Sequence, residues 1–290
     1  MKILRSLDDL RAWQDAVGWT QHNTGFVPTM GALHDGHRSL IALAAARADR
    51  TVVSVLVNPT QFNDASDFEQ YPRTLTRDAE IAGRAGADAV FAPTAEDLYG
   101  GTPVAPAVSW GPLTDALEGA FRPGHFDGVV AVVDRLFQAV RPGFAVFGEK
   151  DLQQVAVVRR LAQERHADVE IVVGPLVRDG QGLALSSRNA RLSPEAQTHA
   201  LALHRSLQAL QAVAREGVAT GQGPDWKRAL DDARASLASQ PGVRLEYLDL
   251  VDAHTFAEWR GEPATASRAH AVVAAHVGGV RLIDNAPLMG

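Results

Sequence analysis

The sequence predicts an α/β protein whose N-terminal part is a Rossmann-like, doubly wound parallel sheet, followed by a smaller α+β domain. In the first 175 or so residues, short Val- and Phe-rich runs alternate with longer helix-forming runs, as in strand–helix–strand units. The apolar runs lack polar alternation, which favours strands buried on both faces of a parallel sheet. This alternation stops at Gly174-Pro175, so we expect domains at 1–176 and 177–290.

The elements follow from these patterns in order. In the first domain, strands are expected at 25–27, 51–57, 89–91, 145–147 and 169–173, and helices at 39–50, 75–85, 128–140 and 152–165. In the second, Ser193 and Pro194 are typical of a helix start, and the amphipathic run continues to residue 216. A loop (217–224), a second helix (226–239) and a small antiparallel sheet (244–251, 271–277 and 280–283) complete the prediction.

The composition limits the class of function. The chain has 290 residues, 46% of them hydrophobic and 21% charged, which is typical of a soluble globular protein. Its net charge of −6 argues against non-specific nucleic-acid binding. It has no cysteine, which excludes disulfides and thiolate metal sites. Since neither a signal peptide nor an apolar run long enough to span a bilayer is evident, we expect a cytoplasmic protein without membrane contact.

The most informative stretch lies between the first expected strand and the helix after it. There a Gly-containing turn leads to His34 and His37. A strand-to-helix turn directs backbone N–H groups and the positive helix end at one point, which stabilises an anion, and two histidines add further donors. We favour a polyphosphate site. A zinc site shared by the two histidines and a pair of solvated loop histidines are the alternatives.

Four further stretches carry polar side chains. Asn58 and Gln61 follow the second strand, where amides can bind hydroxyl or carboxylate groups, although Asn-Pro is also a turn signal. Lys150 and Asp151 could contact a nucleotide, with Gln154 about one turn further along on the same side of the helix, or the segment is simply a charged helix start. The remaining two stretches are Ser186, Ser187 and Arg188, an anion-binding strip or a capping cluster, and Arg122 with His125, a functional loop or a tight connection.

In this order, the stretches resemble the pantothenate synthetase family, AMP-forming ligases that join pantoate to β-alanine and belong to the nucleotidyltransferase superfamily. The resemblance rests on P-T-M-G-A-L-H-x-G-H (28–37), N-P-T-Q-F (58–62), Y-P-R-T (71–74), R-P-G-H-F-D-G-V (122–129), G-E-K-D (148–151) and S-S-R-N (186–189). Leu185 and Leu152 replace a usual Met and a common aromatic residue, and both read as packing positions.

The resemblance implies roles for individual residues. His37 is implied as the proton donor and His34 as a group that holds the phosphates, and together with Lys150 and Arg188 they are the candidates for supplying positive charge to the reaction. Gln61 is implied as a contact to pantoate and then to β-alanine. Gln154 is implied to bind pantoate, and Asn58, Tyr71, Arg122 and His125 are further candidates for substrate binding. ATP is implied to contact Met30, Gly31, Ala32, Leu33, His34, Asp35, Gly36, His37, Gly148, Glu149, Lys150, Asp151, Val177, Leu185, Ser186, Ser187 and Arg188.

The implied reaction makes pantoyl adenylate and pyrophosphate, then pantothenate and AMP. Mg²⁺ is implied on the ATP phosphates with no protein metal ligand, residues 178–189 as a mobile lid, and a homodimer as the assembly. Two alternatives stay open. A nucleotidyltransferase that adenylylates a phosphate would need basic residues around the acceptor instead of glutamines. A catalytically silent nucleotide-binding or RNA-associated module is the other, and the acidic net charge argues against RNA.

Overall fold

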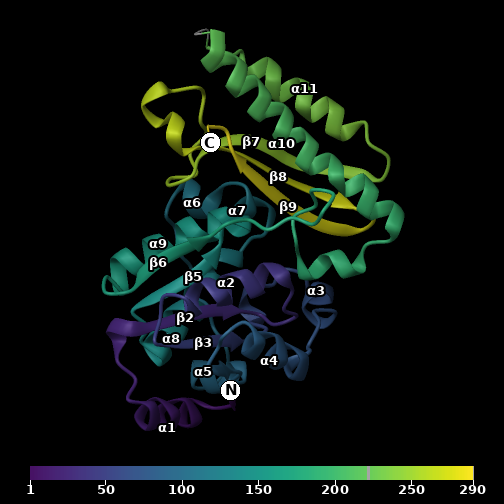
Figure 1. Cartoon of the computed structure of the whole chain (residues 1–290). Coiled ribbons are helices and arrows are strands. Elements are labelled where there is room, and N and C mark those ends of the chain that lie inside the picture. Colours follow the sequence, from purple (N-terminus) through teal and green to yellow (C-terminus); the bar gives the residue numbers. More distant parts are fainter. Residues whose placement is uncertain (221–222, 290) are drawn as a thin grey trace. The chain divides into compact units, whose positions relative to one another are not determined.

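The computed structural model describes residues 1–220 and 223–289, which form two compact units (Figure 1). The first unit contains Met1–Glu149 and Gln154–Pro175, and the second contains Lys150–Gln153 and Leu176–Gly290. The G-E-K-D stretch is therefore divided, with Gly148 and Glu149 in the first unit and Lys150 and Asp151 in the second.

A six-stranded parallel sheet forms the centre of the first unit. Its strands are β1 (Lys2–Leu4), β2 (Thr24–Thr29), β3 (Arg50–Val55), β4 (Ala89–Phe91), β5 (Phe144–Gly148) and β6 (Glu170–Gly174). They lie in the order β1-β4-β3-β2-β5-β6, and all neighbours are parallel. This order confirms the doubly wound α/β class, because the winding direction reverses between β2 and β5.

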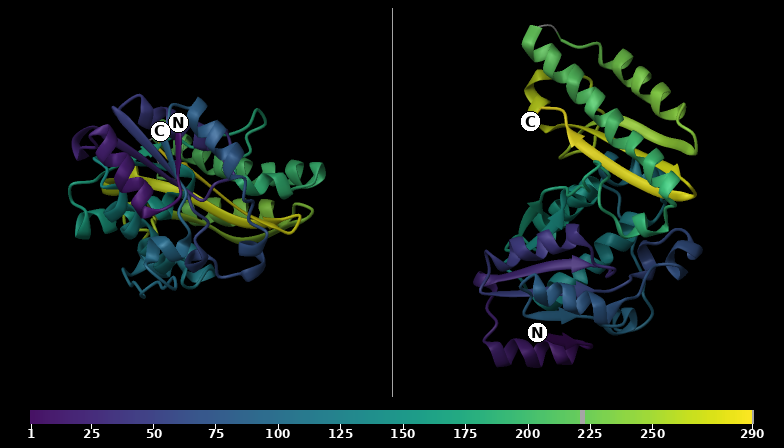
Figure 2. Two further views of the ribbon diagram at one scale, coloured as in Figure 1. Left: turned by 90° about the horizontal axis from the view of Figure 1, so that it is seen from below. Right: turned by 45° about the vertical axis from the view of Figure 1, so that its right-hand side comes forward.

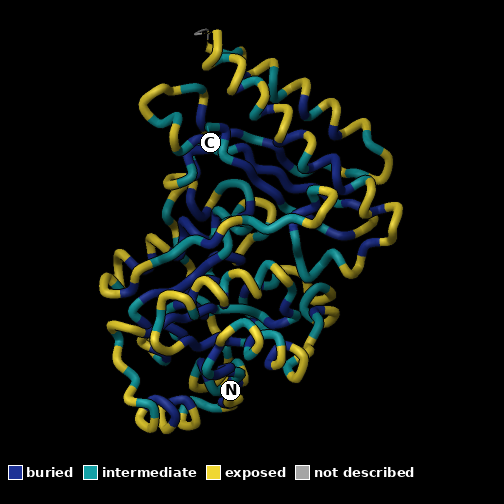
Figure 3. Tube along the Cα trace, in the orientation of Figure 1, coloured by how far each residue is buried: buried dark blue, intermediate teal, exposed yellow. Residues whose placement is uncertain are grey.

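Both faces of this sheet are buried, as the unbroken apolar runs predict. On β2, Val27 belongs to a core cluster with Ile41 and Ala79 of the helices on one face. The preceding residue, Phe26, points to the other face, where its ring meets Phe137 edge-on with centroids 6.4 Å apart. Figure 3 shows the strands as the most continuously buried segments of this unit.

The helices of the first unit start earlier or end earlier than expected at several places. The helix expected at 39–50 runs over Asp35–Ala45, because His34 caps it and Arg50 already begins β3, which ends at Val55. The helix expected at 128–140 begins at His125. The helices are α1 (Leu7–Val17), α2 (Asp35–Ala45), α3 (Ala65–Glu69), α4 (Leu75–Arg84), α5 (Ala95–Tyr99), α6 (Pro112–Asp115), α7 (Glu118–Phe121), α8 (His125–Val140) and α9 (Leu152–Arg165), with 3-10 turns η1 (Gln21–Asn23), η2 (Pro59–Gln61) and η3 (Glu149–Asp151).

The second unit is an antiparallel sheet with two long helices on one face. Its strands β7 (Val243–Asp252), β8 (Ala269–Val277) and β9 (Val280–Pro287) lie in that order. Figure 2 shows α10 (Pro194–Thr220) and α11 (Trp226–Ala238) running across this sheet. Two 3-10 turns, η4 (Ser187–Arg191) and η5 (Pro263–Arg268), lie in the connections.

One expectation for this unit is wrong in part. The loop expected at 217–224 begins later, because α10 continues through Gly217 to Thr220; a single helical glycine costs only about 1 kcal/mol relative to alanine. Residues 221–222 of that loop lie outside the described residues. Within the described part, none of the helices combines the length and apolarity required to cross a membrane.

Candidate active site

The carboxyl ends of three neighbouring strands carry the first three polar stretches. The His34 turn follows β2, Asn58 and Gln61 follow β3, and Gly148 closes β5. Because β2 lies between β3 and β5 in a parallel sheet, these turns emerge at the same edge, next to the point where the winding reverses. In open α/β sheets ligands bind at this edge.

His34 and His37 form a reciprocal cap at the start of α2. The backbone N–H of Gly36 donates to His34 Nδ1 at 3.2 Å, and the backbone N–H of His34 donates to His37 Nδ1 at 3.4 Å. The two rings lie with centroids 4.1 Å apart. The spacing of three residues therefore serves helix capping and also pairs the imidazoles at a positive helix end.

The caps define which nitrogen of each ring carries the proton. Since each Nδ1 accepts a backbone hydrogen bond, a neutral ring must carry its hydrogen on Nε2. Each imidazole is therefore a donor at Nε2 without needing a positive charge. Such donors suit the oxygens of a phosphate.

Gln61 is buried and held by the residues around it. Its Oε1 accepts from Asn58 Nδ2 at 3.1 Å, and its Nε2 donates to the sulfur of Met30 at 3.2 Å. Thioether sulfur is a weak acceptor, so the amide hydrogens of Gln61 can be given to a ligand oxygen at little cost. The structure thus brings Met30, Asn58 and Gln61 together.

Asn58 is committed to protein partners. It is fully buried, and its second Nδ2 hydrogen bond goes to the carbonyl of Gly128 at 3.1 Å. Its Oδ1 accepts from the hydroxyls of Thr60 and Tyr99, each at 3.1 Å. This geometry favours a role in holding Gln61 over direct contact with a substrate.

Arg122 and His125 also hold the Gln61 segment. The carbonyl of Gln61 can only accept, so His125 Nδ1, 2.9 Å away, donates to it. His125 Nε2 is then the acceptor for Arg122 Nη1 at 3.0 Å, and Arg122 also pairs with Glu118 at 3.3 Å. His125 is buried. The loop that sequence left open between function and connection therefore supports the backbone of Gln61.

Gly128 allows a close backbone approach between α8 and η2. A Cβ added there would lie 2.3 Å from the carbonyl oxygen of Thr60 and 2.5 Å from the Cα of Gln61. Only glycine lets α8 pack this closely against η2. The need for this close contact explains why the R-P-G-H-F-D-G-V stretch has glycine at position 128.

Tyr99 and Tyr71 complete the surroundings of η2. Burial raises the pKa of the Tyr99 phenol, although its hydrogen bonds with Thr60 and Asn58 and the charge of Arg135 oppose this shift. The phenol stays protonated and can donate to Asn58. Tyr71 is buried and packs edge-on against Phe62 with centroids 5.8 Å apart. Gln154, on α9, is half-buried.

In the second unit, the C-terminal strand holds the turn that contains Lys150. Asn285 Nδ2 donates to the backbone carbonyl of Lys150 at 3.0 Å. The Lys150 ammonium lies 3.7 Å from a carboxylate oxygen of Asp151. Because the backbone of Lys150 is anchored and its side chain is half-buried, the ammonium group can reach only a limited region.

The loop after β6 is tied to the same strand. Arg178 donates to both carboxylate oxygens of buried Asp284, at 2.6 and 2.9 Å, and to the carbonyl of Gly182 at 3.1 Å. Leu185 donates its backbone N–H to the carbonyl of Val177 at 3.0 Å, which brings these two expected ATP contacts together. The forked ion pair thus orders the segment that precedes Ser186.

Ser186 serves as a helix cap. Its hydroxyl oxygen accepts the backbone N–H of Arg188 at 3.2 Å at the start of η4. The capping alternative is therefore correct for Ser186, and its hydroxyl hydrogen can still be donated. Ser187 and Arg188 are half-buried in the same turn.

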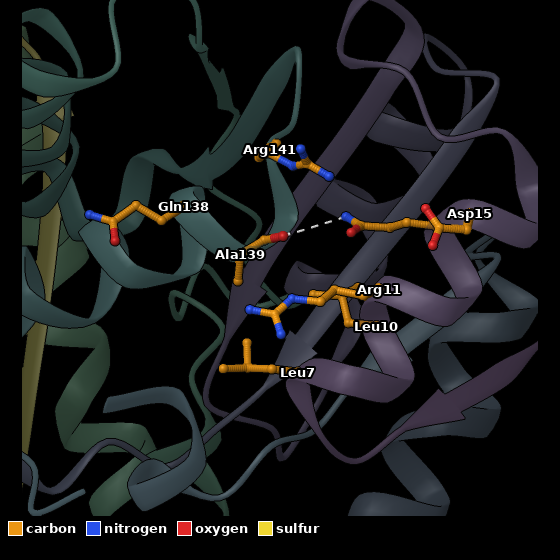
Figure 4. Close-up of a pocket in the computed structure, with 8 residues that line it drawn as sticks. Leu7, Leu10, Arg11, Asp15, Gln138, Ala139 and Arg141 are labelled. Carbon is orange, nitrogen blue, oxygen red and sulfur yellow. Dashed lines mark hydrogen bonds between the residues drawn. The ribbon is translucent and has the colours of Figure 1, made fainter. Parts of the chain in front are cut away.

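Potential metal ligands are not clustered in the described residues, and a cavity lies away from the expected site residues. The described residues contain no group of three His, Asp or Glu side chains arranged to bind a metal ion. A cavity of about 420 Å³ lies between α1 and the end of α8 and is lined by none of the expected site residues (Figure 4). There Gln14 donates to the carbonyl of Val140 at 2.9 Å, which satisfies the C-terminal end of α8.

The sequence patterns did not identify three residues that hold segments of the candidate site. Asp78 accepts backbone N–H groups of the turn after β2, Tyr99 orients Asn58, and Asp284 orders Arg178. Each is linked to its partner only in the folded chain. The first lies on α4 four residues after the Y-P-R-T stretch, which is the single local signal that pointed to it.

Comparison with known proteins gives consistent matches. The family described as pantoate-beta-alanine ligase matches residues 2–287. The chain is 48% identical to the pantothenate synthetase of a Nocardioides species, over 91% of this chain and 78% of the relative. It is 43% identical to that of Bacteroides fragilis over 98% of both.

Solved structures give the same result. The crystal structure of pantothenate synthetase from Thermus thermophilus matches with a TM-score of 0.89 at 40% identity, covering 100% of both chains. Pantoate-beta-alanine ligase from Francisella tularensis, complexed with beta-gamma ATP and beta-alanine, matches with a TM-score of 0.79 at 30% identity over 99% of this chain and 98% of that one.

Proposed function

Because this chain belongs to the pantoate-beta-alanine ligase family, whose function is the formation of pantothenate, we propose that the residues described above carry out this condensation with ATP in two steps. In the first, a carboxylate oxygen of pantoate attacks the α-phosphorus of ATP. The bond to the bridging oxygen breaks, so that pyrophosphate leaves and pantoyl adenylate forms. The observation that carries the proposal is the paired imidazole cap after β2, together with the neutral amide of Gln61 after the neighbouring strand β3.

The first unit supplies donors for this step. His34 and His37 donate from Nε2 to phosphate oxygens, where negative charge grows in the transition state. Gln61 donates its amide hydrogens to pantoate without bringing a charge, which suits an acceptor that must remain nucleophilic. Asn58, Arg122 and His125 hold the Gln61 segment, as their hydrogen bonds indicate.

The second unit carries charged and hydroxyl side chains that belong to the same proposal. Lys150 and Arg188 carry fixed positive charge, and Ser186 and Ser187 carry hydroxyl donors, all suited to phosphate oxygens. Gln154, at the start of α9 in the first unit, is a second neutral amide for pantoate. The lid role of residues 178–189 stays a prediction.

In the second step, the amine of β-alanine attacks the adenylate carbonyl. A C–N bond forms, the amine loses a proton, and AMP leaves with the electrons of the C–O bond. A nucleophilic side chain is not needed, and the lack of cysteine is compatible with this.

Three finer features belong to the same proposal. Mg²⁺ accompanies ATP and is held chiefly by phosphate oxygens and water, a mode that requires no cage of protein carboxylates. The assembly is a homodimer, and the compartment is the cytoplasm. The homodimer rests on the family resemblance, and the compartment is the one expected from the sequence.

Pyrophosphate release tests the proposed function. The chain mixed with ATP and Mg²⁺ should release pyrophosphate only when pantoate is added, and β-alanine should then produce AMP. Release that is indifferent to pantoate, or that needs a phosphorylated acceptor, would overturn the proposal.

His37→Ala tests its catalytic part. Loss of a transition-state donor should slow adenylate formation by about 10²-fold in a single-turnover assay. His22→Ala is the matched control, because His22 is an exposed histidine of the same unit. A His37→Ala rate near wild type would remove this residue from the mechanism.

A further inference from the structure

A buried carboxylate holds the turn between β2 and the histidine pair. Asp78, on α4, is fully buried. Its Oδ2 accepts the backbone N–H of Ala32 at 3.1 Å, and its Oδ1 accepts that of Leu33 at 2.8 Å. The hydroxyl of Thr74 donates to Oδ2 at 3.1 Å. Among the described residues Asp78 forms no ion pair, so its charge is stabilised by these donors and by the positive end of α4.

The turn that Asp78 holds has an uncommon backbone. Gly31 has a φ of 86° and Ala32 a φ of 51°. The left-handed region is unfavourable for alanine, so the surrounding structure must impose it. A Cβ on Gly31 would lie 2.9 Å from Val55 and 3.0 Å from Asp78 Oδ2, which leaves room only for glycine.

Two consecutive N–H groups in such a turn form a concave anion site. Here an internal carboxylate occupies it, so the N–H groups of Ala32 and Leu33 are already used. A phosphate at this turn must therefore be bound by the next residues, beginning with the His34 and His37 cap. The direction in which that cap faces depends on how the turn before it is held.

We propose that Asp78 is a positioning residue for the adenylation step, because its carboxylate sets the Gly31–Ala32 turn and thereby orients His34 and His37. The inference rests on the proposed roles of these two histidines. Thr74 assists, since its hydroxyl donates to Asp78 and, in the structure, caps no backbone N–H of α4.

Asp78→Asn tests this role with little change in size. One carboxylate oxygen becomes an NH₂ group, which cannot accept and faces backbone N–H groups. We expect kcat of adenylation to fall by about 10²-fold, because a small misplacement of reacting groups can cost that much in rate. The KM for pantoate should stay within about two-fold of wild type. Ala82→Gly is the control, because it weakens the same helix at a buried position away from the turn.

A double-mutant cycle separates positioning from general destabilisation. If Asp78 acts through His37, the loss in the Asp78→Asn, His37→Ala double variant should be well below the product of the single losses. Multiplying losses would overturn the inference, as would a wild-type kcat in Asp78→Asn. Absence of pantoate-dependent pyrophosphate release in the wild-type chain would instead overturn the proposed function.

Thr74→Val keeps the test valid if Asp78→Asn does not fold. Valine keeps the shape of threonine and removes one donor to Asp78, so kcat should fall by about five-fold, as the loss of one hydrogen bond of ordinary strength predicts. An unchanged kcat in a folded Thr74→Val protein would count against the role of the Thr74–Asp78 contact and overturn the inference.

Discussion

Gly128→Ala should disturb pantoate binding without adding or removing any polar group. The new Cβ would lie 2.3 Å from the Thr60 carbonyl oxygen, whereas ordinary contact begins at 3.4 Å. The helix α8 and the η2 turn must therefore separate by about 1 Å. Because the three atoms nearest to the new Cβ all belong to the backbone of Thr60 and Gln61, no side-chain rotation can relieve the contact.

The consequence for activity follows from the position of Gln61. A displacement of about 1 Å in a positioning segment can cost about 10²-fold in rate. We therefore expect kcat/KM for pantoate to fall by about 10²-fold. Overpacking should also lower the free energy of unfolding by about 1–3 kcal/mol.

The assay measures pantoate-dependent pyrophosphate release over a range of pantoate and of ATP, together with urea unfolding. Gly223→Ala is the matched control, since a Cβ there meets no atom within 4 Å. Equal losses of kcat/KM toward ATP and toward pantoate would refute the assignment of Gln61 to pantoate. A kcat/KM for pantoate within about three-fold of wild type would refute the rigidity of the contact between α8 and η2.

The other predictions concern the second unit. Asp284→Ala leaves the Arg178 guanidinium without its carboxylate, so the free energy of unfolding should fall by about 3–5 kcal/mol in urea titration; a loss below about 1 kcal/mol would show that the pair contributes little. Burial, assisted by the charge of Arg178, lowers the pKa of His204 below its ordinary value of 6.5. The unfolded chain then binds this proton more readily, so stability should fall as pH drops below 6.5 toward the lower folded pKa. His204→Gln should flatten the dependence of Tm on pH over this range, and an unchanged slope would contradict the assigned cause.

Much of the fold was predictable because its signals are local. Strands buried on both faces require continuous apolar runs, and these are visible at 89–91 and 145–147 without knowledge of their neighbours. Element ends were less predictable. The start of α2 at Asp35 depends on imidazole caps, which composition does not mark as helix starts.

The roles around Gln61 needed the folded chain. The contact between Asn58 and Gly128 spans 70 residues, and that between Asp78 and Ala32 spans 46. On α4, Asp78 has the sequence context of any acidic residue in a first helical turn. Arg122 and His125 were candidates for substrate binding from sequence, and in the folded chain each also donates a hydrogen bond to the carbonyl of Gln61.

The sequence by itself determined the fold class, the family resemblance and the spacing of the histidine pair, because hydrophobic periodicity, residue spacing and motif order can be read along the chain. Only the tertiary structure decided which polar groups are already satisfied by the protein. That distinction depends on contacts between distant segments, made when the order of the strands places the ends of β3, β2 and β5 side by side. The same fold lets Asp78 accept the N–H groups of the turn after β2, and the proposed function then assigns the phosphates to the capping histidines.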